Sequence, residues 1–335
     1  MTNTQPKTTR ARGRAPRRVL VTGGAGFIGA RLVTALVAAG DVVTAVDNFH
    51  RGRRAALAAL RGHPRCRLLP GDVADPACAA AIRRLRPQVV YHLAAIHYIP
   101  ECLADPAQTA RVNVLGTQRV LDAIPSRALE RAILISSGAV YAPQTRPVTE
   151  QDRVAPLEIY GTSKWVGELL WQTVARETPR AAWLVARLFN TYGPGETNPH
   201  LLPHLVAALR RGRTVRLGEL AACRDFIYIE DTVEALLAVG RLDRRFAVFN
   251  VGSGKAASVA AVLRLLERLL GAPITVIQEA GRRRPLDRRY LCADITKLRR
   301  ATGWRPRWAL RDGLRVWLEE EGVLPVRRGP CDADE

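Results

Sequence analysis

Tyr160 and Lys164 are four residues apart, a spacing that places a phenol and an ammonium on the same face of a helix. A phenol is a poor base at neutral pH because its ordinary pKa is about 10. A neighbouring ammonium favours the phenolate and lowers that pKa. Such a pair can take a proton from an alcohol while a nicotinamide takes the hydride from the same carbon. The pattern therefore predicts alcohol oxidation, or a reaction that begins with it.

A glycine-rich turn at residues 22–29, Thr-Gly-Gly-Ala-Gly-Phe-Ile-Gly, predicts a binding site for the nicotinamide cofactor. It lies between an apolar run at 19–21, which predicts a buried strand, and a predicted helix over 27–39. Asp47 follows a second apolar run at 42–46, where dinucleotide folds place the carboxylate that binds the adenosine ribose. A carboxylate there repels the 2′-phosphate of NADP, so NAD is the predicted cofactor. The arginines at 51, 53 and 54 argue the other way, because they offer a site for that phosphate.

Further motifs follow in order along the chain: Gly71-Asp72-Val73, residues 92–95 (His-Leu-Ala-Ala), Asn113 in Asn-Val-Leu-Gly-Thr, and the segments 136–141, 187–194 and 224–231. With these motifs the chain, over roughly residues 17–320, resembles the extended short-chain dehydrogenases/reductases of the NAD-dependent nucleotide-sugar epimerase/dehydratase family, and in particular UDP-sugar 4-epimerases. The resemblance implies that NAD is held by Gly23, Gly26, Phe27, Ile28, Gly29, Asp47, Asn48, Asp72, Val73, Leu93, Ala94, Ala95, Asn113, Tyr160 and Lys164.

The predicted catalytic residues are Ser137, Tyr160 and Lys164. Tyr160 is the general base, and Lys164 lowers its pKa and holds the nicotinamide ribose. Ser137 ends an apolar strand predicted at 132–135, where its hydroxyl can bond the reacting sugar oxygen and relay a proton.

The two residues after Ser137 decide among the reactions that the resemblance implies. Sugar 4,6-dehydratases of this family carry Asp-Glu there, and uronate decarboxylases commonly keep a glutamate at the second place. Here the places hold Gly138 and Ala139, which cannot move a proton. We therefore predict an epimerase that inverts C4 of UDP-glucose/galactose or UDP-glucuronate/galacturonate through a 4-keto intermediate. The alternatives are a nucleotide-sugar 4-ketoreductase, a 4,6-dehydratase or decarboxylase, and a non-catalytic nucleotide binder.

The resemblance also predicts where the sugar nucleotide binds. Its implied contacts are His97, Ser137, Asn190, Arg224, Arg284 and Asp287. Arg284 would bind phosphate and Asp287 the nucleoside ribose, although the family usually has glycine where Leu286 stands. His97 either reads the 6-position of the sugar or is a surface histidine without a role.

Alternating strand and helix patterns predict an α/β fold, a Rossmann-type doubly wound parallel sheet with a smaller C-terminal α/β substrate lobe. Residues 1–16 are a predicted disordered tail, and 17–190 with about 223–255 form the NAD-binding domain. Residues 191–222 and 256–325 form the substrate lobe. We expect the substrate between the lobes, outside the carboxyl ends of the strands.

Composition argues against several other classes of protein. The net charge of +20 comes largely from arginines spread along the chain, without the clustering or motif spacing of a nucleic-acid binder. The six scattered cysteines predict neither a metal site nor a disulfide framework. No signal peptide or membrane span is recognisable, so a cytoplasmic enzyme is predicted. The resemblance implies dimerisation through the helices beginning near Asn113 and Tyr160, and apolar residues at 166 and 169–171 exceed what one core-facing stripe requires, so a homodimer is predicted.

Overall fold

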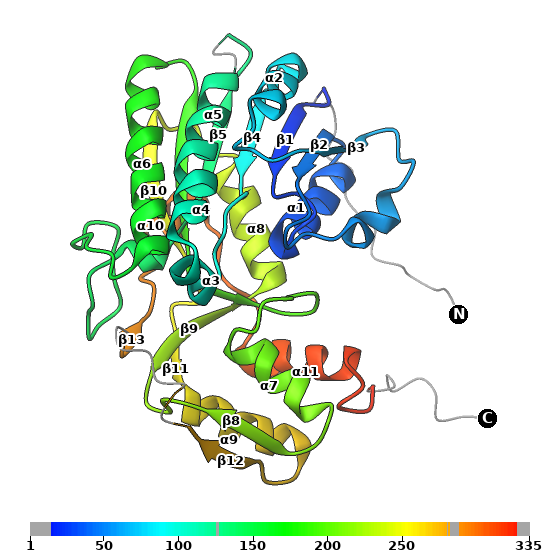
Figure 1. Cartoon of the computed structure of the whole chain (residues 1–335), viewed down its shortest axis with the longest axis vertical. Helices are drawn as coiled ribbons and strands as arrows, with labels where there is room; N and C mark the ends of the chain where they lie inside the picture. Colours follow the sequence, from blue (N-terminus) through cyan, green and yellow to red (C-terminus); the bar gives the residue numbers. More distant parts are fainter. Residues whose placement is uncertain (1–14, 125–126, 280, 282–287, 327–335) are drawn as a thin grey trace.

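The computed structural model describes residues 15–124, 127–279, 281 and 288–326, which form two lobes (Figure 1). The larger lobe contains a seven-stranded sheet in the order β10-β6-β5-β4-β1-β2-β3, and every neighbouring pair is parallel. Its strands are β1 (Arg18–Thr22), β2 (Val42–Asp47), β3 (Cys66–Pro70), β4 (Val89–His92), β5 (Arg131–Ser137), β6 (Ala182–Leu188) and β10 (Phe246–Val251). The predicted doubly wound parallel sheet is confirmed.

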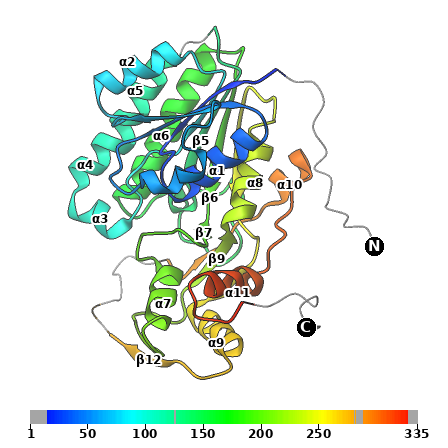
Figure 2. The ribbon, with the colours of Figure 1, turned by 90° about the vertical axis from the view of Figure 1, so that its right-hand side faces the viewer.

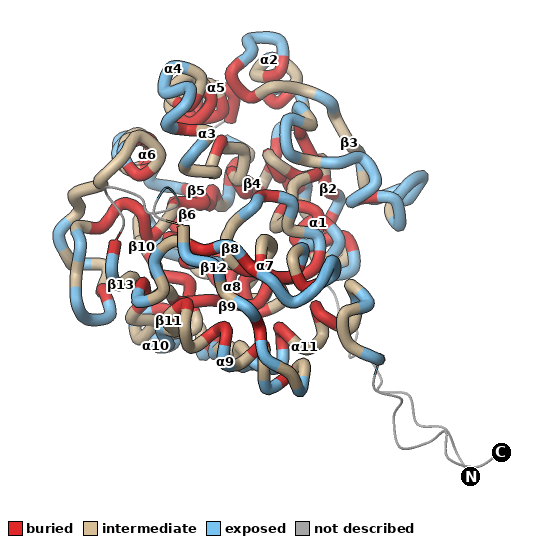
Figure 3. Tube along the Cα trace, turned by 60° about the horizontal axis from the view of Figure 1, so that its bottom comes forward, coloured by how far each residue is buried: buried red, intermediate tan, exposed pale blue. Residues whose placement is uncertain are grey.

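Helices cover both faces of this sheet, which explains why the central strands are apolar along their whole length. Figure 2 shows α1 (Phe27–Ala38) and α8 (Ile229–Val239) on one face, and α2 (Pro76–Leu85), α5 (Gly116–Ala123) and α6 (Ile159–Glu177) on the other. Buried residues, red in Figure 3, follow the strands between these layers. The order of the strands reverses between β1 and β4, and ligands of such sheets bind outside the carboxyl ends of the strands at this point.

The smaller lobe is built around two short sheets. One joins β7 (Asn190–Tyr192), β9 (Cys223–Tyr228), β11 (Ala256–Ser258) and β13 (Tyr290–Leu291), and the other pairs β8 (Thr214–Leu217) with β12 (Thr275–Gln278). Its helices are α7 (Leu201–Leu209), α9 (Val259–Leu270) and α11 (Leu310–Glu320). In α9 the buried residues recur at helical spacing, Ser258 caps the first turn through Ala261 N (3.1 Å), and Gly271 ends the helix in the left-handed region.

Short helical segments complete the chain between the larger elements. They are η1 (Arg54–Leu60), α3 (Ile99–Ala104), α4 (Pro106–Ala110), η2 (Arg111–Leu115), η3 (Gly138–Val140) and α10 (Thr296–Thr302). Asn113 lies inside η2, a π-helical turn between α4 and α5, so the helix predicted to begin near Asn113 begins at Pro106 instead. The wide turn lets the Asn113 side chain leave the helix and bond to neighbouring segments.

The division of the chain between the lobes differs from the prediction at two places. Strand β9, predicted to belong with 223–255 in the cofactor-binding domain, pairs with β7, β11 and β13 in the smaller sheet. Helix α10, predicted in the substrate lobe, packs on α8 and β10 of the large sheet. Both segments lie where the chain passes between the lobes, and the local sequence there carries little information about which sheet a segment packs against.

Two further observations concern the described residues. None of their helices is long and apolar enough to cross a membrane. Their cysteines, 66, 78, 102, 223 and 292, are free thiols.

Candidate active site

A cavity of about 810 Å³ opens at the carboxyl ends of the large sheet and extends between the lobes. It is lined by the turn after β1, by the ends of β2, β4, β5 and β6, and by β7, β9 and the N-terminal part of α7. All but one of the predicted site residues within the described part of the chain line this cavity, the exception being Asn113. Arg284 and Asp287 lie outside the described residues.

The glycine-rich turn brings the backbone of α1 directly to the cavity. Gly23 has φ +69°, and a Cβ there would lie 2.9 Å from Ala94 N, so only glycine fits. Gly26, Phe27, Ile28 and Gly29 follow along the cavity wall at the start of α1. A helix N-terminus with exposed backbone N–H groups favours an anion, so this wall fits the pyrophosphate of a dinucleotide.

Asp47 is fixed at the end of β2 beside this turn. Its Oδ2 accepts a hydrogen bond from Ala25 N (2.9 Å) and its Oδ1 from Phe49 N (2.7 Å). Arg51, which also lines the cavity, is paired with Glu101 (2.5 Å), while the Arg54 guanidinium lies 4.3 Å from the centre of the Phe49 ring. Asp47 therefore presents a carboxylate where a ribose would lie, and Glu101 offsets the charge of Arg51.

Replacing Asp47 with alanine should shift cofactor preference from NAD toward NADP by about tenfold or more, or about 1.4 kcal/mol. The reason is that the repulsion against a 2′-phosphate disappears while the neighbouring arginines remain. Binding of both cofactors by fluorescence titration would measure the shift. Asp75→Ala is the matched control, because Asp75 is exposed and does not line the cavity. An unchanged preference in Asp47→Ala would show that another residue selects the cofactor.

Asp72 and Val73 line the predicted adenine end of the cavity. Asp72 accepts from Ala74 N (2.9 Å) and pairs with Arg111 (2.6 Å), which fixes the loop after β3. Leu93, Ala94 and Ala95 form the opposite wall after β4.

His92 and Asn113 support that wall from behind. The His92 ring bonds Thr22 Oγ1 (2.7 Å) and Thr117 Oγ1 (2.9 Å), and burial lowers its pKa to about 3, so it is neutral. Asn113 Oδ1 accepts from Ile96 N (2.8 Å), and its Nδ2 donates to Ile96 O (2.9 Å) and Ser163 Oγ (2.9 Å). The predicted cofactor contact at Asn113 is thus a buried clamp that ties the loop after β4 to α6.

Ser137 and Tyr160 meet because two turns approach each other closely. Glu158 caps α6 by accepting from Tyr160 N (2.7 Å) and Gly161 N (3.1 Å). A Cβ at Gly161 would lie 2.5 Å from Ala139 O, so glycine is needed for α6 to begin this close to β5. The Ser137 and Tyr160 side chains are neighbours on the cavity wall as a result.

The pKa of Tyr160, the predicted general base, differs from expectation. Burial raises the pKa of Tyr160, and the neighbouring Ser137 hydroxyl offsets this only in part. The prediction that Lys164 brings this pKa below its usual value is therefore wrong for the protein alone. Lys164 is itself buried, which lowers its pKa to about 8 although Glu168 favours its charged form. Both groups lie in a low-dielectric wall, where an added positive charge acts strongly.

The sugar-nucleotide end of the cavity is lined by His97, Asn190 and Arg224. Sequence reasoning missed several groups that line it as well, namely Glu196, His200, His204, Arg216, Arg288 and Arg289. Arg288 is buried and donates to Ala139 O (2.7 Å) and Tyr141 O (3.2 Å), so it joins the stretch after 287 to the turn that follows Ser137. The run of arginines at 282–289 was the available signal, since several cations close together suit a diphosphate.

Residues 19–252 match the model of the NAD dependent epimerase/dehydratase family. The chain is 34% identical over 304 residues to a dTDP-glucose 4,6-dehydratase of Streptomyces griseus, covering 88% of this chain and 91% of the relative. It is 31% identical over 309 residues to a UDP-glucose 4-epimerase of Mycolicibacterium smegmatis, covering 90% and 97%.

This chain is also similar to solved structures over most of its length. MoeE5 in complex with UDP-glucuronic acid and NAD has a TM-score of 0.81 and 32% identity, covering 90% of this chain and 98% of the other. UDP-glucuronic acid 4-epimerase from Bacillus cereus, in complex with UDP-glucuronic acid and NAD, has a TM-score of 0.83 and 26% identity, covering 91% and 99%.

Proposed function

Since the chain belongs to the NAD-dependent epimerase/dehydratase family and uses NAD, we propose that it inverts C4 of a UDP-hexose or UDP-hexuronic acid. The relatives catalyse more than one reaction, and the observation that carries this choice is the turn after Ser137. Gly138 and Ala139 offer no acid or base there. A Cβ at 138 would lie 3.2 Å from the Phe189 ring, so an acidic side chain would need that ring to move.

The residues around the cavity suit the proton transfers of such a reaction. Tyr160 takes the proton of the sugar 4-hydroxyl, and Ser137 holds that oxygen through its own hydroxyl. Bound NAD supplies the hydride acceptor and a positive ring, which favours the phenolate. Lys164 adds a second positive charge in the same wall and fits the nicotinamide ribose.

The return step needs the same residues in reverse. The 4-keto sugar first rotates in the cavity. Tyr160 would then return the proton to the C4 oxygen as C4 is reduced from its opposite face. The diphosphate end stays held while the sugar turns, and Asn190 and Arg224 are the residues we propose for it. No proton leaves a carbon atom in this sequence, so no further base is required.

The test is a product analysis in deuterated water with UDP-glucose, UDP-glucuronate, UDP-N-acetylglucosamine and dTDP-glucose. We expect a UDP-hexose or UDP-hexuronate to be converted to its C4 epimer with no deuterium on carbon, because the C4 hydrogen travels as hydride. Nuclear magnetic resonance of the products reads both the epimer and the label.

Each alternative gives a different result. A 4,6-dehydratase yields a 4-keto-6-deoxy sugar with solvent deuterium at C5, and a decarboxylase releases carbon dioxide from the uronate. A ketoreductase converts none of these four sugars, because each already carries the 4-hydroxyl that it would form; given a 4-keto sugar nucleotide and NADH, it consumes NADH in proportion to product. Any of these outcomes overturns the epimerase assignment while leaving the family and the roles of Tyr160 and Lys164 in place.

We also propose a homodimer formed through α5 and α6. Leu115, the last residue of η2 immediately before α5, and Leu169 on α6 are both 42% exposed, and η2 and α5 both pack against α6. Trp171, predicted to contribute, is instead fully buried against His92 and Trp183, and Leu170 packs on the core. The proposed contact is therefore narrower than the sequence predicted.

Light scattering should give twice the 36.8 kDa mass of the chain at micromolar concentration. Leu169→Glu should shift the mass toward the monomer, because it places a charge in an apolar contact. Ile277→Glu is the matched control, since Ile277 is an exposed apolar residue on β12 of the other lobe. A monomeric mass for the unaltered protein would contradict the proposal.

A further inference from the structure

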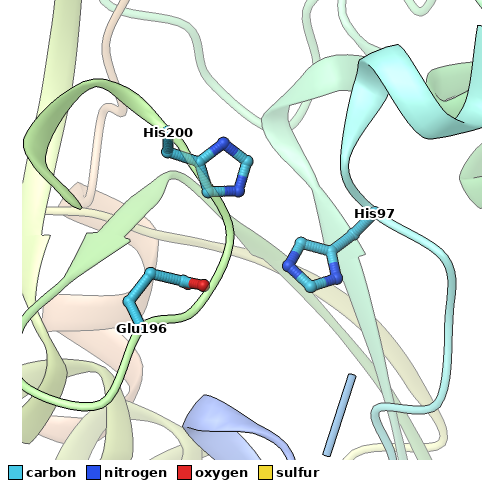
Figure 4. A group of neighbouring side chains, drawn as sticks. All are labelled: His97, Glu196 and His200. Atoms are coloured by element: carbon cyan, nitrogen blue, oxygen red, sulfur yellow. The ribbon is translucent and has the colours of Figure 1, made fainter. Parts of the chain in front are cut away.

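His97, Glu196 and His200 come together at the sugar-nucleotide end of the cavity (Figure 4). His97 lies on the loop after β4, whereas Glu196 and His200 lie on the connection between β7 and α7. One nitrogen or oxygen atom from each lies within 4.8 Å of the others. Among the described histidine, cysteine, aspartate and glutamate residues, these three form the group whose ligand atoms lie close enough together to hold a metal ion.

A fourth residue, Asn198, reaches into the same group. Its Nδ2 donates to His97 Nε2 (3.0 Å) and to Glu196 Oε1 (3.1 Å). The side chain is buried, with Asn198 only 2% exposed, yet its Oδ1 has no hydrogen-bond partner. A buried amide oxygen without a partner costs about 1–3 kcal/mol, so its presence calls for an explanation.

We propose that His97, Glu196, His200 and Asn198 bind one divalent transition-metal ion, with Zn²⁺ the best fit to the ligand set. Two imidazoles and one carboxylate are typical zinc ligands, and imidazole disfavours Mg²⁺ and Ca²⁺. Turning the Asn198 amide by half a turn places Oδ1 beside His97 and Glu196 and puts Nδ2 in the position that has no partner, so binding of the ion must also offset the cost of that buried donor. Oxygen next to a carboxylate oxygen is repulsive unless a cation lies between them.

The distances agree with a four-ligand site. Ligands about 2.1 Å from a tetrahedral ion are separated from each other by about 3.4 Å. The Asn198 amide already lies 3.0 and 3.1 Å from His97 and Glu196, and the ligand atoms of His97, Glu196 and His200 lie within 4.8 Å of one another, so they need to approach by about 1.4 Å at most.

The surroundings prepare His97 for this role. The backbone of Ala95 lies beside its ring, and its Nε2 faces the group through the Asn198 amide. A backbone contact of this kind is the usual support for a metal-binding histidine. The His200 ring is held edge-on by Tyr98, with ring centres 5.5 Å apart.

A bound ion would join the two lobes across the cavity, since its ligands come from both. The proposal does not depend on the sugar or on the reaction, because the site is defined by the protein's own side chains. The sequence predicted no metal site because residues 97 and 196 are far apart and the Glu-x-Asn-x-His run matches no known spacing signature.

The test uses untagged, chelator-treated full-length protein and Zn²⁺ alone, measured by isothermal titration calorimetry. We expect one ion per chain with a Kd in the micromolar range or tighter. Co²⁺ in its place should give visible absorption bands of a low-coordinate site. His200→Gln and Glu196→Gln should each weaken binding by more than the roughly 10–100-fold that loss of an outer-shell partner costs.

His63→Gln is the matched control, because His63 is an exposed histidine outside the cavity, and it should bind Zn²⁺ as the unaltered protein does. Circular dichroism shows whether each variant is folded. Absence of Zn²⁺ binding to the unaltered protein, or equal binding by His200→Gln, Glu196→Gln and His63→Gln, would overturn the proposal.

Discussion

Replacing Tyr160 by phenylalanine is expected to lower turnover by a factor on the order of 10³ while leaving the fold and NAD binding intact. The substitution removes one hydroxyl, which neighbours Ser137 and is the group proposed to move the proton in both half-reactions. The ring itself keeps its place in the wall of the cavity, since α6 is fixed by the Glu158 cap.

Initial-rate kinetics at saturating substrate would measure this effect, with bound NAD quantified after denaturation. Tyr290→Phe is the matched control, because it removes a tyrosine hydroxyl outside the cavity and should keep near-normal activity. If Tyr160→Phe kept more than about a tenth of the activity, the loss would be too small for a general base, and the assignment would fall.

The sequence predicted the elements that position this chemistry because each has a strong local signal. The apolar strands before Gly23, Asp47 and Ser137 are present with nearly the predicted limits, and the helix predicted to begin near Tyr160 begins at Ile159. Parallel strands end at one edge of a sheet, so residues at those ends had to gather there.

What the sequence did not predict depends on contacts between distant segments. Asn113 matched a family motif, but its amide bonds to Ile96 and Ser163 and stays behind the cavity wall. The pKa of Tyr160 is governed by burial, which no local spacing reveals. The group around His97 forms only when the connection between β7 and α7 folds over the loop after β4.

A buried ion pair beneath the catalytic residues also escaped the sequence analysis. Glu168 and Arg187 are 2% and 3% exposed and are joined by a 2.6 Å contact. Glu168 Oε1 also accepts from Ser136 Oγ (2.5 Å). Burial disfavours the Arg187 guanidinium, but its hydrogen bonds with Glu168 outweigh this and raise the pKa of Arg187.

The position of this pair links stability to the site. Glu168 lies one helical turn after Lys164 and favours its charged form, and Ser136 immediately precedes Ser137. The Arg187 guanidinium also lies 4.7 Å from the centre of the Tyr141 ring, close to the turn that follows Ser137. Losing the carboxylate should therefore disturb both the end of β5 and the charge at Lys164.

Glu168→Ala is expected to lower the free energy of unfolding by about 3–5 kcal/mol, because it leaves the Arg187 charge buried without its partner. Urea unfolding followed by circular dichroism would measure it, with the slope checked for a constant transition. Glu177→Ala, an exposed glutamate on the same helix, should change stability by no more than about 0.5 kcal/mol.

Removing both charges separates the cost of an orphaned cation from the worth of the pair. Glu168→Leu combined with Arg187→Met should recover most of the stability lost in Glu168→Ala, because apolar side chains of similar volume can replace a buried pair. Turnover should stay low in the double variant, since Lys164 would still lack the carboxylate that favours its charged form. A loss below about 1 kcal/mol in Glu168→Ala would mean that water or rearrangement compensates Arg187, and that the pair does not support the site.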